Sequence, residues 1–85
     1  MNKILKFSAS WCQPCKHLAK TIETLDQDQQ SQFTSYDIDE CDRNLLAQYN
    51  IRGIPSLVVL DEHGNVKKQT SGALSKQTLI ELLDA

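Results

Sequence analysis

The sequence has little of what membrane, disulfide-stapled or nucleic-acid-binding proteins need. No uninterrupted apolar segment approaches the roughly 20 residues of a membrane-spanning helix, and lysines interrupt the apolar residues of the first six positions, unlike the core of a secretory signal. Nine basic residues are scattered among eleven acidic ones, for a net charge of −2, which leaves no basic stripe for nucleic acid or anionic lipid. Three cysteines are an odd number, which argues against a disulfide framework. We therefore expect a cytoplasmic protein that acts on proteins or small molecules.

Length and hydrophobic content indicate how much structure the chain can form. Its 85 residues, 40% of them hydrophobic, fit one domain over residues 1–85 and contain no repeat, linker or low-complexity segment. A chain of this size buries about two-thirds of its unfolded surface, so we expect an adequate core and moderate stability.

Hydrophobic periodicity predicts the element order βαβαββα. Strands are expected over residues 3–8, 33–38, 57–60 and 66–70, and the third is apolar throughout, as in a strand covered on both faces. Helices are expected from Pro14 to about Gln29, around residues 45–49 with Asn50 as C-cap, and after an N-cap at Ser75. A parallel right-handed crossover followed by a hairpin predicts an α/β fold with a mixed four-stranded sheet flanked by helices.

Cys12 and Cys15 form a Cys-x-x-Cys at the start of the first predicted helix, with Pro14 in its first turn. Cysteines three apart on a helix have Cβ atoms about 5–6 Å apart, so they can open and close a disulfide. Cys12 meets the free N–H groups and solvent, whereas Cys15 lies one turn along the core-facing stripe, so we expect Cys12 to attack a substrate disulfide and Cys15 to resolve it. Lowering the thiol pKa to about 7 requires about 2 kcal/mol, more than a helix N-terminus usually supplies, so we also expect backbone hydrogen bonds to the Cys12 sulfur.

The alternative interpretation of this cysteine pair is that it forms half of a structural zinc site. Cys41 and either His17 or His63 would then complete the site. Zinc motifs normally supply a second ligand pair at fixed spacing, so we expect no metal, and no cofactor. Cys41 is expected to be an inert thiol, with a regulatory role as the alternative.

The segment Trp11-Cys12-Gln13-Pro14-Cys15-Lys16 resembles the Trp-Cys-Gly-Pro-Cys-Lys motif of the thioredoxin family. Residues 49–56 resemble that family's approach to its cis-proline, and residues 72–76 resemble its final turn and helix start. The resemblance covers nearly the whole chain and implies a thioredoxin-like fold that lacks the first strand and helix of a full thioredoxin. By position it implies a cis-proline at Pro55 and a shallow apolar client-binding surface formed by Trp11, Gly53, Ile54, Gly72 and Ala73, with backbone pairing at Ile54.

Two positions depart from the family pattern. Thioredoxins usually have a buried aspartate six residues before the first cysteine, where it helps to take the proton from the resolving thiol. This chain has Lys6 at that position, so that base is missing, and the lysine that often accompanies the aspartate falls near Ser35. A Lys6 directed towards the sulfurs would favour thiolate and make the protein more oxidising than a typical thioredoxin, whereas a Lys6 that extends to solvent would not. Gln13 in place of glycine should also alter the redox potential.

The resemblance implies a monomeric protein disulfide reductase that thioredoxin reductase, or an equivalent flavoprotein donor, keeps reduced. Ribonucleotide reductase is a typical client of the family. A glutaredoxin-like reductase that depends on glutathione is one alternative. A redox-independent binding or assembly subunit that uses the surface of Trp11, Ile54 and Gly72 is another.

Overall fold

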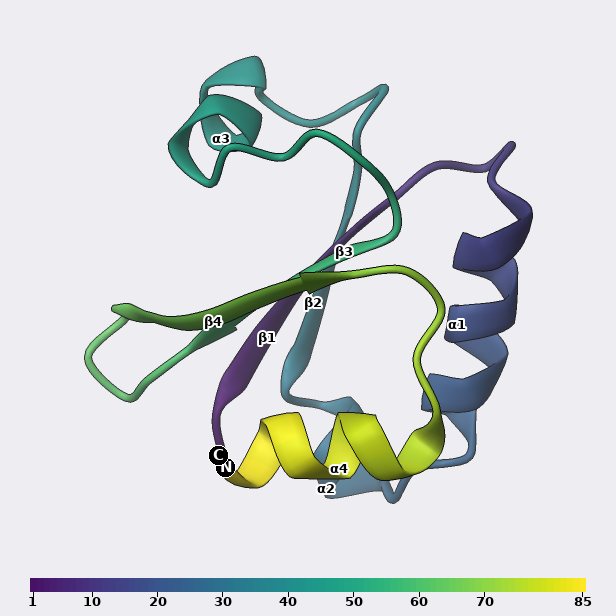
Figure 1. Cartoon of the computed structure of the whole chain (residues 1–85), viewed down its shortest axis with the longest axis vertical. Coiled ribbons are helices and arrows are strands. Elements are labelled where there is room, and N and C mark those ends of the chain that lie inside the picture. Colours follow the sequence, from purple (N-terminus) through teal and green to yellow (C-terminus); the bar gives the residue numbers. More distant parts are fainter.

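Four strands form one mixed sheet in the computed structural model, which describes residues 1–85 (Figure 1). They are β1 (Lys3–Ser8), β2 (Phe33–Asp37), β3 (Ser56–Leu60) and β4 (Val66–Ser71), and their order across the sheet is β2-β1-β3-β4. β1 pairs in parallel with β2 and antiparallel with β3, and β3 pairs antiparallel with β4. The predicted mixed four-stranded sheet is therefore confirmed, and every strand lies within one residue of its predicted bounds.

Four helices accompany the sheet, one more than the periodicity predicts. They are α1 (Gln13–Glu23), α2 (Gln27–Gln30), α3 (Arg43–Gln48) and α4 (Lys76–Asp84). α4 begins as predicted, because the Ser75 side chain accepts a hydrogen bond from the Thr78 amide. Asn50 lies one residue beyond the C-cap of α3, with φ at 52°, a left-handed conformation common just after a helix end.

The prediction of one helix from Pro14 to about Gln29 is wrong at its C-terminal end. α1 stops at Glu23, where the Thr24 hydroxyl bonds back to the Thr21 carbonyl at 2.6 Å. Asp26 then starts a new turn, and the Gln29 side chain accepts the Asp26 amide at 3.0 Å. The apolar spacing continues through this break because Leu25 remains buried in the same core.

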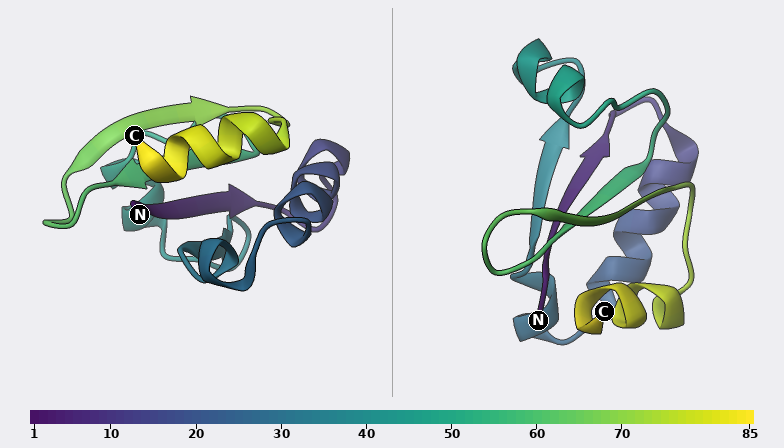
Figure 2. Two further views of the ribbon diagram at one scale, coloured as in Figure 1. Left: turned by 90° about the horizontal axis from the view of Figure 1, so that it is seen from below. Right: turned by 60° about the vertical axis from the view of Figure 1, so that its left-hand side comes forward.

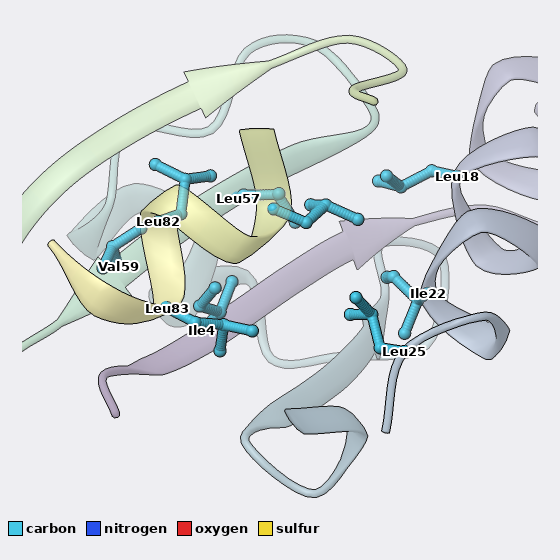
Figure 3. Packing of buried hydrophobic residues seen from close by; sticks show 9 residues of the cluster. Ile4, Leu18, Ile22, Leu25, Leu57, Val59, Leu82 and Leu83 are labelled. Carbon is cyan, nitrogen blue, oxygen red and sulfur yellow. The ribbon is translucent and has the colours of Figure 1, made fainter. Parts of the chain in front are cut away.

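The main core lies between the sheet and the helices α1 and α4 (Figure 3). It contains Ile4 of β1, Leu57 and Val59 of β3, and apolar residues from α1, from the segment that follows it and from α4: Leu18, Ile22, Leu25, Leu79, Leu82 and Leu83. Leu57, Val58 and Val59 are all fully buried, so β3 is covered on both faces as predicted.

The opposite face of the sheet carries an aromatic cluster. Phe7 of β1 stacks on Tyr36 of β2 with ring centroids 5.3 Å apart, and Tyr49, at the end of α3, lies 6.2 Å from Phe7. α3 is thereby anchored at the end of the sheet where β1 and β2 finish.

The two chain ends lie side by side at the other end of the sheet (Figures 1 and 2). The Asn2 amide donates to the Leu83 carbonyl at 2.7 Å, and its side chain donates to the carbonyls of Leu82 and Ala85, both at 2.9 Å. No helix combines the length and the apolar character that a membrane crossing requires.

Candidate functional site

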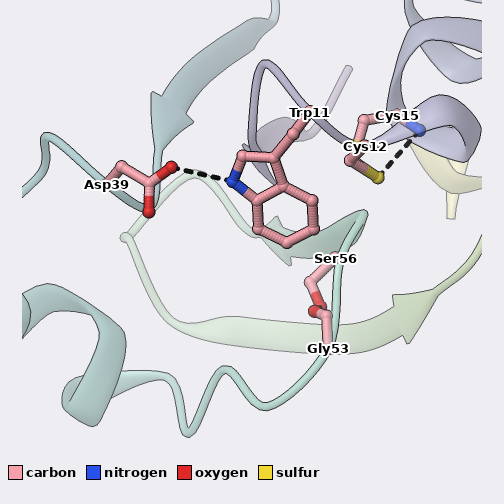
Figure 4. Close-up of a disulfide and its surroundings, with 6 residues drawn as sticks. All are labelled: Trp11, Cys12, Cys15, Asp39, Gly53 and Ser56. Atoms are coloured by element: carbon pink, nitrogen blue, oxygen red, sulfur yellow. Dashed lines mark hydrogen bonds between the residues drawn. A yellow bond between two sulfur atoms is a disulfide. The ribbon is translucent and has the colours of Figure 1, made fainter.

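Cys12 occupies the N-cap of α1, just beyond the end of β1. Its backbone is extended, and its Sγ accepts a hydrogen bond from the Cys15 amide at 3.2 Å (Figure 4). Pro14 stands in the first turn, where it removes no helix hydrogen bond. The backbone hydrogen bond that we expected at the Cys12 sulfur is therefore present, and it satisfies one of the free N–H groups of the helix start.

Cys12 and Cys15 are joined by a disulfide, with their Cα atoms 5.2 Å apart. The expectation that solvent distinguishes the two residues is wrong, because Cys12 is 5% exposed and Cys15 3% exposed. What distinguishes them is position: the Cys12 sulfur faces the helix N-terminus, while Cys15 lies inside the first turn.

Apolar residues pack against the disulfide on one side. Ala9 is buried with the two cysteines, and Ile38 and Ile54 pack against this group. The Ile54–Pro55 peptide bond is cis, as the resemblance predicted, and the Pro55 carbonyl accepts the Gly72 amide at 2.9 Å. Gly72 adopts φ of 95°, which only glycine tolerates readily.

Trp11 is 65% exposed, so it is not an ordinary core aromatic. Its indole Nε1 donates to Asp39 Oδ2 at 2.9 Å (Figure 4). Asp39 follows β2, and nothing in the sequence pattern marks it as a partner of Trp11, because the two residues are 28 positions apart.

The other residues that we predicted for the client-binding surface lie at the same end of the fold as the cysteines, but not all of them contact the cysteines or Pro55. Ile54 touches the cysteine group and Gly72 bonds to Pro55, whereas Gly53, Ala73 and Gln13 are exposed. The Gly53 carbonyl accepts the Ser56 hydroxyl at 2.5 Å, which holds the approach to Pro55 (Figure 4).

Lys6 lies on the wall of a hollow of about 230 Å³, called here the Cys15 hollow, whose lining also includes Cys15, Lys16 and Asp37. Burial lowers the pKa of Lys6 from its usual value of 10.5, and the nearby Glu23 carboxylate partly opposes this shift. Lys6 is therefore half-buried in a space that also reaches Cys15, with Glu23 as its electrostatic partner.

The residues of the zinc alternative do not converge. Cys41 is a free, half-buried thiol, and His17 and His63 are both exposed. No group of three or more His, Cys, Asp or Glu side chains has the arrangement that could hold a metal ion.

A disulfide closed across a single helical turn, in an apolar setting beside a cis-proline, can exchange two electrons with another disulfide while the rest of the fold stays in place. That chemistry defines the protein as a thiol–disulfide oxidoreductase.

Comparison with known proteins identifies the family. The thioredoxin family model matches residues 1–85. A thioredoxin of Pseudomonas aeruginosa is 36% identical over 84 residues, which cover 96% of this chain and 76% of that protein. A thioredoxin of Mycoplasma genitalium is 33% identical over 84 residues, with 98% and 80% covered. The X-ray structure of Fasciola hepatica thioredoxin superposes with a TM-score of 0.81 at 26% identity and covers 98% of this chain and 78% of that one. The chain belongs to the thioredoxin family.

Proposed function

We propose that residues 1–85 act as one domain that reduces disulfides in client proteins by two successive thiol exchanges. Cys12 attacks the client disulfide to form a mixed disulfide, and Cys15 then attacks Cys12 and releases the reduced client. The observation that carries this assignment is the Cys15 amide that donates to Cys12 Sγ, because the same donor would stabilise a Cys12 thiolate at the N-terminus of α1.

The client would bind over the exposed ring of Trp11 and the cis-proline turn. Trp11 supplies an uncovered aromatic face held by Asp39, and Ile54 lies against the cysteines with its backbone at the turn. Pairing of a client strand with the backbone at Ile54 would place its disulfide near Cys12. Gly53 and Gly72, which have open space beside them, and the exposed Ala73 would leave room for that strand.

Lys6 is proposed to favour thiolate in the dithiol form, because Lys6 and Cys15 line the same hollow. The test is a thiol titration of the Lys6→Asp variant together with its redox potential. Replacement should raise the thiol pKa and make the protein more reducing, and unchanged values of both would remove Lys6 from the mechanism.

Recharging by a flavoprotein thioredoxin reductase in the cytoplasm fits a dithiol reductase, since that compartment keeps thiols reduced. The decisive assay is insulin disulfide reduction by the monomeric chain with NADPH and thioredoxin reductase, compared with glutathione as donor. We expect turnover with the reductase. Turnover with glutathione alone would favour the glutaredoxin-like alternative, and no turnover with either donor would refute the reductase assignment. Trapping with Cys15→Ser would then show whether ribonucleotide reductase is among the clients.

A further inference from the structure

The Cys15 hollow contains one carboxylate, that of Asp37. Cys15 must lose a proton before it can attack the mixed disulfide, and the proposed exchange assigns no group to accept it. A volume of about 230 Å³ has room for several water molecules at roughly 30 Å³ each. The hollow can therefore hold water between Cys15 and a base that does not touch it.

Strand register places Asp37 at this hollow. Ser8 and Asp37 are paired across the parallel ladder between β1 and β2. Side chains alternate along a strand, so Ser8 and Lys6 share the α1 face with buried Ile4, while Tyr36 stacks on Phe7 on the other face. Asp37 therefore projects towards α1, beneath the turn that carries Cys15.

One oxygen of the Asp37 carboxylate accepts a hydrogen bond within the protein, and the other does not. Its Oδ1 accepts the Asp39 amide at 2.9 Å, which fixes the side chain at the end of β2. Its Oδ2 remains free to accept a proton or a water hydrogen bond. Asp37 is half-buried, so a proton held there stays close to the hollow.

We propose that Asp37 is the proton acceptor for Cys15, acting through water in the Cys15 hollow; this rests on the proposed order of attack by Cys12 and resolution by Cys15. The Cys15 thiol gives its proton to Asp37, and its thiolate attacks Cys12 Sγ. The Sγ–Sγ bond forms, the bond from Cys12 to the client sulfur breaks, and the electron pair leaves on the client thiolate, which takes a proton from solvent. Two electrons have then passed from the dithiol to the client, and Asp37 returns its proton to solvent.

The charged groups around Asp37 suit this role. Lys6 lines the hollow from β1 and Lys16 from α1, so positive charge lies near the one negative charge that the transfer moves from the Asp37 carboxylate to the Cys15 thiolate. The Glu23 carboxylate interacts electrostatically with Lys6, and the Asp39 carboxylate accepts a hydrogen bond from Trp11, so each of these two acids already has a partner. Asp37 is the remaining acid that faces the space beside Cys15.

The test uses the reduced full chain and a symmetrical aromatic disulfide whose released thiolate is coloured. Attack by Cys12 releases the first thiolate and resolution by Cys15 the second, so stopped-flow absorbance separates the two steps. Asp37→Asn keeps the Oδ1 acceptor for the Asp39 amide and loses the base. A positioned base typically contributes about 10²–10⁴-fold, and because water intervenes we expect a smaller loss, about tenfold, in the second phase at about pH 6.5. The first phase should be unchanged. Asp37→Glu should restore part of the rate, and Asp28→Asn, an exposed charge-matched control on α2, should alter neither phase.

The pH profile separates proton transfer from a structural effect. Hydroxide can take the thiol proton directly as pH rises, so the rates of Asp37→Asn and wild type should converge by about pH 9. An equal second phase at about pH 6.5 would overturn the proposal, and so would a deficit that persists at about pH 9. If the wild-type chain shows no second phase, the proposed order of attack and resolution fails instead.

Discussion

The indole Nε1 of Trp11 is hydrogen-bonded to Asp39 Oδ2 at 2.9 Å, although the ring itself is 65% exposed. The hydrogen bond to the charged carboxylate thus fixes the orientation of an aromatic side chain that is not packed in the core. The ring presents a prearranged face next to Cys12, so the ordering cost of binding a client is reduced before the client arrives.

Asp39→Ala should therefore weaken client binding without slowing the chemistry. An exposed bond of this kind contributes about 1 kcal/mol, so KM for insulin should rise about fivefold while kcat stays the same. Steady-state reduction with saturating thioredoxin reductase measures both constants. Asp39→Asn retains an acceptor oxygen and should lie near wild type. An equal loss with a small aromatic disulfide would contradict a role in client binding.

The two cysteines should give opposite results when each is replaced by serine. Cys15→Ser should accumulate a mixed disulfide between Cys12 and the client, whereas Cys12→Ser should form none. Both should reduce insulin at least about a hundredfold more slowly than wild type. Mass spectrometry after acid quenching detects the adduct, and Cys41→Ser is the matched control with wild-type turnover. A double variant, Cys12→Ser with Cys15→Ser, that retained full biological function would support the redox-independent alternative.

Lys6 should destabilise the fold at neutral pH, because burial lowers its pKa. The folded protein holds this proton less tightly than the unfolded chain, so stability rises as pH increases from the lowered pKa towards 10.5. Lys6→Met keeps the apolar stem and should raise Tm by about 2–4 °C, with the lost attraction to Glu23 as a partial offset. Calorimetry should show the gain shrinking at alkaline pH. Lys3→Met, an exposed position on the same strand, should leave Tm nearly unchanged, and a lower Tm for Lys6→Met would contradict the prediction.

Asp61 should contribute to the loss of stability in acid. Hydrogen bonds from the backbone amides of Asn65 and His63 lower the pKa of its carboxyl below the usual 3.8. Its contribution is complete above the unfolded value and is lost as pH falls through the folded value. NMR titration should find a pKa below 3.8. Asp61→Asn, which keeps an acceptor, should remove this part of the acid dependence, whereas Asp61→Ala should be less stable at every pH. A carboxyl that titrates at or above 3.8 would refute the assignment.

Local sequence signals predicted most of the fold. Pro14 and Ser75 mark helix starts by their own backbone chemistry, and the apolar run at residues 57–60 indicates the central strand. The break after Glu23 could not be predicted from periodicity, because Leu25 continues the buried stripe while a hydroxyl and a side-chain amide form the break.

The site was predicted in its cysteines and missed in its carboxylates. The spacing of Cys12 and Cys15 predicts a redox pair, because residues three apart lie within one helical turn. Asp37 and Asp39 reach the site only through the parallel register of β1 and β2, a pairing between segments some thirty residues apart that no local pattern encodes. Two carboxylates two residues apart at the end of a strand are common. Their role here therefore depends on which residues the neighbouring strand β1 and the turn after it place next to them.

The adjacency of the two chain ends has a consequence for engineering. Asn2 bonds to the last turn of α4, at the end of the sheet away from Cys12. A short peptide could therefore join the ends, and new ends could open in the exposed turn at His63 and Gly64, giving a circular permutant with the disulfide and its setting intact. The existing ends would equally serve as attachment points for an electrode or a fluorescent fusion, leaving the redox face directed outward.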